Sequence, residues 1–533
     1  MTDTFCRDNL PAEDARPDFV FTLPELQYPD RLNAAVELLD ATIARLGPDR
    51  PALLTPAGET WTYGELSERV DRIARVLVDD LGVVPGNRVV LRAPNNPWLA
   101  ACWLAVLKAG AVAVTTMPLL RPLEIATLAD ITRPTVALCD IRFLDDLVAA
   151  AVPDLRIVPV GGGTPDDLVQ RAAGKPARFD AVDTAADDVA LLALTSGTTG
   201  RPKATMHYHR DVLAMADTFS AHVVKPTADD VFTGTPPLGF TFGLGGLLVF
   251  PLRAGAATLL IERATPAELA DIIEQRKVTV CFTAPTAYRA ILAAGAAPKL
   301  AGVRRAVSAG EHLPEATWHA FRESTGLQII DGIGSTEMLH VFVSAADDDI
   351  RPGATGRAVP GYEVTVLDAD GAPAPPGVAG RLAVKGPTGC RYLADPRQAA
   401  YVQDGWNITG DTFVRDDDGY FFYRARSDDM IVSSGYNIAG PEVEEALMAH
   451  PAVLECCVVG VEDADRGQLV KAFVVPTAGT VADDALVADL QAFTKARIAP
   501  YKYPRAIAFV DALPRTSTGK VQRFKLRDAA TAG

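Results

Sequence analysis

The sequence predicts an α/β fold, with a large N-terminal body of several subdomains and a small α/β domain at the C-terminus. Three observations lead to this prediction. Apolar strand-like runs alternate with amphipathic helical stretches as far as about residue 340, a pattern typical of layered, mostly parallel sheets. From about residue 353, short strands and Gly-Pro turns indicate a β-rich module. From about residue 428, helices and strands alternate again.

Length and composition agree with this division. A chain of 533 residues is too long for one ordinary core, so two to four domains are expected. Hydrophobic residues make up 48% of the chain and charged residues 22%, a globular composition. The net charge of −16 argues against nucleic-acid or anionic-membrane partners. An anionic ligand would therefore need the few basic groups that lie inside motifs.

The cysteines and the N-terminus indicate the cellular compartment of the protein. Seven cysteines occur, an odd number without a C-x-x-C pair, so neither structural disulfides nor a zinc site is expected. Residues 1–24 are rich in acids and lack an apolar segment, unlike a signal peptide. No apolar stretch is long enough for a spanning helix. We expect a cytoplasmic protein.

The first elements follow from spacing and turn chemistry. Residues 33–46 have helical spacing, and residues 52–56 and 59–63 form a hairpin around Ala57-Gly58. Thr62 and Glu65 fit a capping box that starts the next helix. That helix carries an apolar stripe of Leu66, Val70, Ile73, Ala74 and Leu77.

The later elements are expected in the same way. Strands are expected at 88–92, 111–114, 134–140, 189–194, 230–236, 279–282, 303–308 and 327–331, and helices at 98–109, 142–150, 211–219 and 265–275. The β-rich module has strands at 363–368, 381–385 and 419–423. The small domain has helices at 441–449 and 485–497 and strands at 454–459, 471–475 and 506–509. Several strands end in small or polar residues, where ligands collect in α/β sheets.

A glycine- and hydroxyl-rich loop follows the strand at 189–194. It contains Thr195, Ser196, Gly197, Thr198, Thr199, Gly200 and Lys203. Glycines allow close backbone approach, hydroxyls and N–H groups donate, and a lysine supplies a point charge for phosphate. The spacing differs from the P-loop of NTPases. A surface turn is the bland alternative, but the density of the string favours phosphate binding.

Four further short segments contain residues that could act in binding or catalysis. Thr336 and Glu337 follow a strand, where a carboxylate beside a hydroxyl suits Mg²⁺, although a capped helix start is equally possible. Asp411 follows a glycine turn and could grip a ribose diol or form an Asx turn. Residues 424–437 lead from charges into a strand and a glycine loop, or form a solvated linker. Lys520 lies on a flexible loop, where it can reach a developing negative charge or belong to a basic tail.

Together, and in this order, these strings resemble the adenylate-forming superfamily of acyl- and aryl-CoA synthetases, adenylation domains and firefly luciferase. The resemblance runs from about residue 30 to 527. The stretches 207–211, 235–246 and 332–340 look most like benzoate- and 2-aminobenzoate-CoA ligases.

The resemblance implies a two-step reaction. A carboxylate attacks the α-phosphorus of MgATP to give an acyl-adenylate, and the thiol of CoA then gives a thioester and AMP. By the matching positions, residues 195–203 hold the β- and γ-phosphates, Thr336 contacts the α-phosphate and Glu337 binds Mg²⁺. Asp411 and Arg426 hold the ribose, and Lys520 bridges the carboxylate and the α-phosphate. The adenine is bordered by Gly310, Glu311, Asp331, Gly332 and Ile333.

The resemblance also implies a moving C-terminal domain. Asp428 matches the hinge, so the body would cover 1–427 and the mobile lid 428–533. Rotation would withdraw Lys520 and bring Gly435 and Tyr436, which line the CoA tunnel, to the site.

The residue types are most informative for the acyl pocket, the predicted binding site of the acid. By the resemblance it is bordered by Phe240, Phe242, Ala284, Tyr288, Ala309, Ile333, Gly334 and His340. Phe240 stands where the superfamily often has histidine. Aromatic walls and small residues suit a planar ring, so an aryl acid such as benzoate, 2-aminobenzoate or salicylate is expected. The phenylalanines could instead be core residues, and His340 could meet an ortho substituent or cap a helix.

Three alternatives remain open from the sequence. The acceptor could be a carrier-protein phosphopantetheine instead of CoA, the acid could be non-aryl, or the chain could be a nucleotide-binding sensor without activity. The complete set of Lys203, Glu337, Asp411, Arg426 and Lys520 counts against the sensor. A homodimer is possible.

Overall fold

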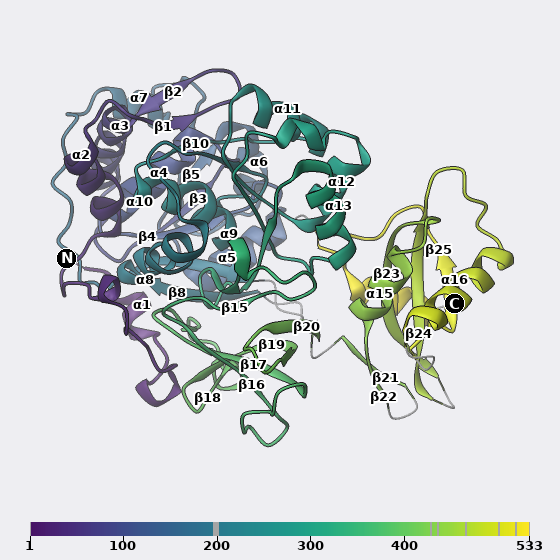
Figure 1. Cartoon of the computed structure of the whole chain (residues 1–533). Coiled ribbons are helices and arrows are strands. Elements are labelled where there is room, and N and C mark those ends of the chain that lie inside the picture. Colours follow the sequence, from purple (N-terminus) through teal and green to yellow (C-terminus); the bar gives the residue numbers. More distant parts are fainter. Residues whose placement is uncertain are drawn as a thin grey trace.

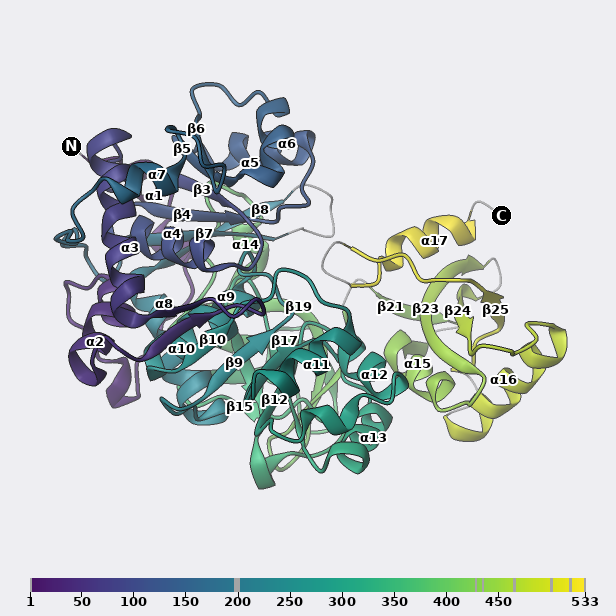
Figure 2. The same ribbon diagram turned by 90° about the horizontal axis from the view of Figure 1, so that it is seen from above.

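The computed structural model describes residues 2–195, 202–426, 429–433, 436–463, 466–498, 502–516 and 520–531. We call residues 2–426 the body and residues 429–531 the lobe. The lobe stands at one side of the body, and its yellow-green elements are clearly separate in both views (Figures 1 and 2). Among the described residues, body strands form three sheets and lobe strands a fourth. This confirms the α/β class with layered sheets and a smaller C-terminal domain.

The first sheet contains the strand that leads into the phosphate loop. Its six strands run in the order β6-β5-β3-β4-β7-β8. They pair in parallel, except that β7 and β8 are antiparallel and place Thr195 opposite Lys203. The strands are β3 (Arg88–Arg92), β4 (Val112–Thr116), β5 (Val136–Asp140), β6 (Arg156–Val160), β7 (Val189–Thr195) and β8 (Lys203–Tyr208).

The second sheet has nine strands in the order β15-β14-β13-β12-β11-β9-β10-β1-β2. Its central strands are parallel, and β12 pairs with β13 so that Ala309 lies beside Gly332. The strands are β1 (Pro51–Leu54), β2 (Thr60–Thr62), β9 (Val231–Gly234), β10 (Ala257–Leu259), β11 (Val280–Thr283), β12 (Arg305–Ala309), β13 (Ile329–Gly334), β14 (Val341–Ser344) and β15 (Arg357–Ala358).

The β-rich module is an antiparallel sheet in the order β16-β17-β19-β18, with β20 paired to β19. Its strands are β16 (Glu363–Leu367), β17 (Ala379–Lys385), β18 (Val402–Gln403), β19 (Trp406–Arg415) and β20 (Phe421–Arg426). The long strand β19 was not expected from the sequence. It contains Gly410 at φ +77° and a register shift after Thr412, which interrupt the alternation that marks a strand.

The lobe sheet has the order β22-β21-β24-β23, with β25 added parallel to β24. Its strands are β21 (Met430–Ser433), β22 (Tyr436–Ala439), β23 (Val453–Asp463), β24 (Gly467–Pro476) and β25 (Ala506–Phe509). Its helices are α15 (Gly440–Met448), α16 (Asp484–Arg497) and α17 (Arg523–Thr531). The last helix follows the Lys520 loop and was not expected within that basic stretch.

The body helices are short, and several continue into π-helical turns. The helix expected at 33–46 is a π-helical segment, Val36–Asp40, followed by α2. The helices are α1 (Phe5–Asp8), α2 (Ala41–Leu46), α3 (Tyr63–Arg75), α4 (Pro97–Lys108), α5 (Pro122–Thr132), α6 (Leu144–Ala149), α7 (Leu168–Ala173), α8 (His209–Met215), α9 (Thr241–Leu244), α10 (Phe250–Ala254), α11 (Pro266–Gln275), α12 (Pro285–Ala293), α13 (Glu315–Thr325) and α14 (Gln398–Tyr401).

Helix α3 shows how local sequence fixes these elements. The Thr62 hydroxyl accepts from the Glu65 N–H, and the Glu65 carboxylate accepts from the Thr62 N–H, so the capping box is confirmed. Such a cap contributes about 1 kcal/mol. All five residues of the expected stripe are buried, and burial of each large apolar side chain stabilises the fold by about 2 kcal/mol.

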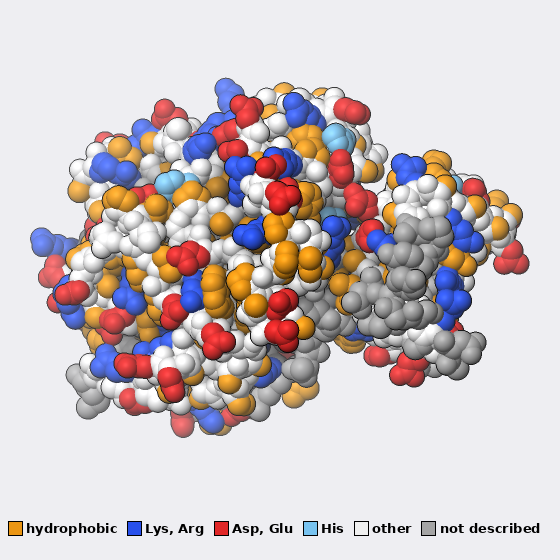
Figure 3. Space-filling model, turned by 60° about the horizontal axis from the view of Figure 1, so that its bottom comes forward, with side chains coloured by type: hydrophobic (Ala, Val, Ile, Leu, Met, Phe, Trp, Pro, Cys, Tyr) orange, Lys and Arg blue, Asp and Glu red, His pale blue; other side chains and the backbone are white. Residues whose placement is uncertain are grey.

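The cysteines and the lengths of the helices both bear on expectations from the sequence. All seven cysteines lie in the described part, where they are buried and unpaired. Across the ranges that the structure describes, none of the helices is long and apolar enough to cross a membrane. On the face shown in Figure 3, acidic and basic side chains are intermixed over both body and lobe.

Candidate active site

A cavity of about 840 Å³ lies where the body meets the lobe. The body contributes the ends of β12 and β13, the start of α12, and parts of β19 and β20. The lobe contributes α15, β23 and the segment around Lys520 (Figure 2). Because β12 and β13 are parallel and paired, their carboxyl ends open on the same edge. Of the residues predicted to bind nucleotide, this edge brings together Gly310, Glu311, Asp331, Gly332 and Ile333.

Lys520 reaches this edge from the lobe. A β-carbon built on Gly310 would lie 3.9 Å from Cε of Lys520. Two hydrogen bonds to Thr516 hold the lysine: the Thr516 N–H donates to the Lys520 carbonyl at 2.8 Å, and the Lys520 N–H donates to the Thr516 hydroxyl at 3.1 Å. The described lobe is thus oriented with Lys520 at the end of the parallel strands.

Asp411 also lines the cavity. It is 7% exposed, and β19 places it in register with Arg426 of β20. The two residues predicted to hold a ribose are therefore neighbours on adjacent strands. The side chain of Arg426 lies outside the described residues.

Asp331 is a carboxylate of the cavity whose proton affinity is raised. Burial at the end of β13 raises its pKa to about 7, because the ionised form loses hydration. Near neutral pH this side chain is poised between the neutral and the charged form.

The phosphate side of the site is built around Lys203 and Glu337. Glu337 is 7% exposed and lies 3.7 Å from the Lys203 ammonium. The hydroxyl of Tyr392 lies between them: Lys203 Nζ donates to Tyr392 Oη at 2.5 Å, and Tyr392 Oη donates to Glu337 Oε1 at 2.5 Å. Thr195 marks the other end of the loop. Ser196, Gly197, Thr198, Thr199 and Gly200 lie outside the described residues.

The turn that carries Thr336 and Glu337 is tied to β8. His207 Nε2 donates to the Thr336 carbonyl at 2.8 Å. Burial lowers the pKa of His207 to about 4, so its ring is neutral near neutral pH. Neither His207 nor Tyr392 was predicted as a site residue. His207 belongs to a stretch that carried the resemblance, whereas no motif covered Tyr392.

The predicted acyl pocket contains a cluster of aromatic rings. The His340 ring centroid lies 5.5 Å from that of Phe242, 5.3 Å from that of Phe219 and 4.6 Å from that of Phe250. Phe242 is partly exposed, and so are Phe240, Ala284 and Ile333, whereas Ala309 is buried and Gly334 exposed. His340 stands in this ring cluster and caps no described helix.

His340 is 2% exposed and uncharged. Burial lowers its pKa to about 3, and its Nε2 lies 3.4 Å from the Phe242 carbonyl. Its Nδ1 has no hydrogen-bond partner among the described atoms. Gly245 lets α9 and the turn after it approach this ring, since a β-carbon there would lie 2.4 Å from Cδ2 of His340.

Of the predicted pocket residues, Ile333 and Gly334 line the main cavity, whereas Tyr288 lies in the core. It is fully buried on α12, its ring packs edge-on against Phe321, and its hydroxyl donates toward the carbonyls of Cys281 and Val307. Thr286 and Arg289 of the same helix line the cavity. Tyr288 therefore belongs to the core behind α12, and we correct its placement.

The predicted hinge and CoA-tunnel residues cannot be placed. Asp428 and Gly435 lie outside the described residues, as does the side chain of Tyr436. Their roles stay predictions, as does the division of the chain at residue 428.

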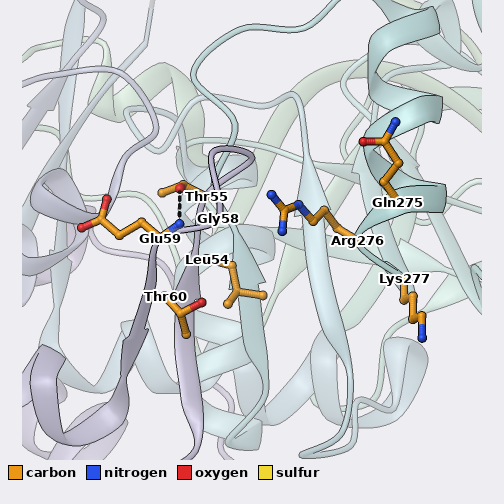
Figure 4. A pocket seen from close by; sticks show the side chains of 8 residues that line it. All are labelled: Leu54, Thr55, Gly58, Glu59, Thr60, Gln275, Arg276 and Lys277. Atoms are coloured by element: carbon orange, nitrogen blue, oxygen red, sulfur yellow. Dashed lines mark hydrogen bonds between the residues drawn. The ribbon is translucent and has the colours of Figure 1, made fainter.

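A second hollow, of about 220 Å³, lies between the β1–β2 hairpin and the end of α11 (Figure 4). Arg276 points across it and donates to the Pro56 carbonyl, while Lys277 points away. The guanidinium of Arg276, which faces this hollow, is therefore already hydrogen-bonded within the protein.

Metal chemistry in the main cavity would rest on few protein ligands. Within the described ranges, no group of three or more His, Cys, Asp or Glu side chains could hold a metal ion. A single carboxylate beside a hydroxyl, as at Glu337 and Thr336, matches the way Mg²⁺ is held when substrate phosphates supply the other oxygens.

Two family models match the chain. Residues 40–392 match the AMP-binding enzyme model, and residues 442–520 match the AMP-binding enzyme C-terminal domain.

Individual relatives match over nearly the whole length. The chain is 38% identical to the benzoate–CoA ligase of Thauera aromatica over 95% of this chain and 98% of that protein. The crystal structure of the anthranilate CoA ligase AuaEII in complex with anthranoyl-AMP superposes with a TM-score of 0.90, at 33% identity over 96% of this chain and 99% of that one. A benzoate CoA ligase from Burkholderia xenovorans LB400 superposes with a TM-score of 0.85, at 33% identity over 93% and 100% of the two chains.

Proposed function

Because the chain belongs to the AMP-binding enzyme family, we propose that it is an AMP-forming ligase that joins an aryl carboxylic acid to CoA through an aryl-adenylate. The observation that carries the proposal is the position of Lys520 at the strand ends that hold Gly310 and Asp331. The likeness to benzoate and anthranilate ligases supports an aryl acid as substrate.

In the first step the acid carboxylate attacks the α-phosphorus of ATP, and pyrophosphate leaves. Both reacting groups are anionic, so their approach is opposed by charge repulsion. The ammonium of Lys520 offsets that repulsion and stabilises the charge that develops at phosphorus. Lys203 and the loop from Thr195 would hold the departing phosphates, and Thr336 the α-phosphate.

The nucleotide would be oriented by the rest of the cavity. Glu311 and residues 331–333 border the base, and Asp411 with Arg426 binds the ribose. Glu337 would hold Mg²⁺, whose bound charge neutralises the phosphates.

The aryl ring would lie against Phe242 and His340. Since His340 presents Nε2–H to a carbonyl, its unpartnered Nδ1 is an acceptor. A ring substituent that donates a hydrogen bond, an amino or hydroxyl group, would satisfy it. This supports 2-aminobenzoate or salicylate ahead of benzoate.

In the second step a thiol attacks the adenylate and AMP leaves. We propose that the lobe turns about Asp428 after pyrophosphate release, withdraws Lys520 and brings Gly435 and Tyr436 to the site. CoA is the proposed thiol, and a carrier-protein phosphopantetheine would react by the same chemistry.

Mass spectrometry of single turnovers tests this order of events. With ATP, Mg²⁺ and an aryl acid but no thiol, bound aryl-AMP should accumulate and should vanish as thioester when CoA is added. If the adenylate reacts only with a phosphopantetheinylated carrier protein, the acceptor is that protein and not CoA. Absence of any adenylate would contradict the function.

A further inference from the structure

Tyr392 joins the two charged groups on the phosphate side of the site. Its hydroxyl accepts from Lys203 Nζ at 2.5 Å and donates to Glu337 Oε1 at 2.5 Å, while the two charges are themselves 3.7 Å apart. The three residues are far apart in sequence, so the contact is made by the fold alone.

The backbone leaves Tyr392 little freedom. Its segment is added to β8, where the Met206 N–H donates to the Arg391 carbonyl at 2.8 Å and the Leu393 N–H donates to the Ala204 carbonyl at 2.9 Å. The Tyr392 N–H donates to Gln398 Oε1 at 2.8 Å. The side chain is buried, and its ring packs edge-on against Tyr401 with centroids 5.7 Å apart. The hydroxyl is thereby fixed at one point.

A phenol is well suited to that point. Its hydroxyl offers one proton and two lone pairs, so it can accept from an ammonium and donate to a carboxylate at once. Hydrogen bonds to charged partners are roughly twice as strong as neutral ones. The Lys203 ammonium also lies 4.2 Å from the Tyr392 ring centroid.

We infer that Tyr392 is a positioning residue for the magnesium–nucleotide complex. It orients one oxygen of Glu337 and leaves the other for the metal, and it holds Lys203 at the mouth of the loop from Thr195 until phosphate arrives. The inference rests on the proposed roles of Glu337 and Lys203.

The test compares Tyr392→Phe with Tyr401→Phe. Each removes one hydroxyl from one of two neighbouring rings, of which Tyr392 is buried and Tyr401 is partly exposed. The Tyr401 hydroxyl contacts Ser335 at 3.2 Å, whereas the Tyr392 hydroxyl contacts Glu337. In ATP–pyrophosphate exchange, Tyr392→Phe should raise the KM for MgATP and the Mg²⁺ concentration for half-maximal rate about tenfold, as the loss of charge-assisted bonds implies. The KM for the acid should change less than twofold. Tyr401→Phe should match the wild type.

Direct binding keeps the test independent of turnover. ATP affinity measured by calorimetry should fall more in Tyr392→Phe when Mg²⁺ is present than in EDTA, where only the contact with Lys203 matters. An unchanged Mg²⁺ dependence overturns the inference, and so does an equal fall in affinity with and without Mg²⁺, because loss of packing alone would cause it. A wild-type enzyme that exchanges pyrophosphate with no acid would instead contradict the proposed function.

Discussion

Arg515 of the lobe lies 3.8 Å from Glu311 of the body, across the cavity that separates the two. The same guanidinium pairs with Glu455 inside the lobe. Arg515 also forms an antiparallel bridge with Val521, next to Lys520. The ion pair therefore links the lobe segment next to Lys520 to the residue that follows Gly310, and it exists only while the lobe has this orientation.

Arg515→Ala should slow adenylation and leave the second half-reaction intact. Loss of a partly exposed ion pair is worth about 1 kcal/mol, so pyrophosphate exchange should fall about fivefold. Synthetic aryl-AMP should react with CoA at the wild-type rate. The matched control is Arg178→Ala, an exposed pair with Asp180 on the body. Equal slowing of both half-reactions would show that Arg515 does not act through lobe orientation.

Lys520→Ala should lower the rate of adenylation far more than Arg515→Ala does. Removal of a charge that stabilises the transition state typically costs 100-fold or more in rate. Exchange should drop by at least that factor, while consumption of supplied aryl-AMP by CoA should continue. Lys299→Ala, which breaks only a surface pair with Asp271, is the control. If Lys520→Ala exchanges normally, the lysine has no role in the first step.

Gly245→Ala should weaken both packing and acid binding. The added methyl would lie 2.4 Å from His340 Cδ2 and 3.0 Å from Phe250 Cζ, so the ring must shift. Overpacking of this kind costs about 1–3 kcal/mol, and the KM for aryl acid should rise while that for ATP stays. Gly302→Ala is the control, since its nearest neighbour atom would be 3.9 Å away. Thermal unfolding and exchange kinetics measure the two effects. Identical behaviour of the two variants would contradict the packing of α9 on His340.

Asp331 should make stability depend on pH. Its pKa is about 7 in the fold, against a usual value of 3.8, so the folded chain holds a proton that the unfolded chain has lost between those values. The contribution of this group is therefore largest at low pH, falls as pH rises toward 7, and is constant above it. Asp331→Asn cannot ionise and should be more stable than the wild type by up to about 4 kcal/mol at pH 8 but not at pH 4. Urea midpoints at the two pH values measure this, and a pH-independent difference would refute the raised pKa.

Local chemistry explains which parts could be predicted from the sequence. Thr62 and Glu65 are three residues apart, and both ends of the capping box are visible in the sequence. The strand ends at Gly310 and Asp331 follow from apolar runs that stop at polar residues. Of the residues that carried motifs, Gly310, Asp331, Asp411 and Lys520 line the same cavity.

The parts of the site that could not be predicted depend on the direction in which a side chain points and on contacts between residues far apart in the sequence. Thr286 and Arg289 face the cavity, but a helix turns about 100° per residue, which points Tyr288 into the core. The resemblance of the segment around Tyr288 to a segment that borders the acyl pocket does not show which of its side chains point into the pocket. Tyr392 meets Glu337, 55 residues away in sequence, only because its segment pairs with β8.

The most direct test of the account is the comparison of kcat/KM for thioester formation with different acids. The series is 2-aminobenzoate, salicylate, benzoate, a short-chain and a long-chain fatty acid, each with ATP, Mg²⁺ and CoA. The aryl acids should exceed both fatty acids by at least about 100-fold, with 2-aminobenzoate or salicylate ahead of benzoate. A fatty acid turned over as well as the aryl acids would contradict the aryl pocket at Phe242 and His340.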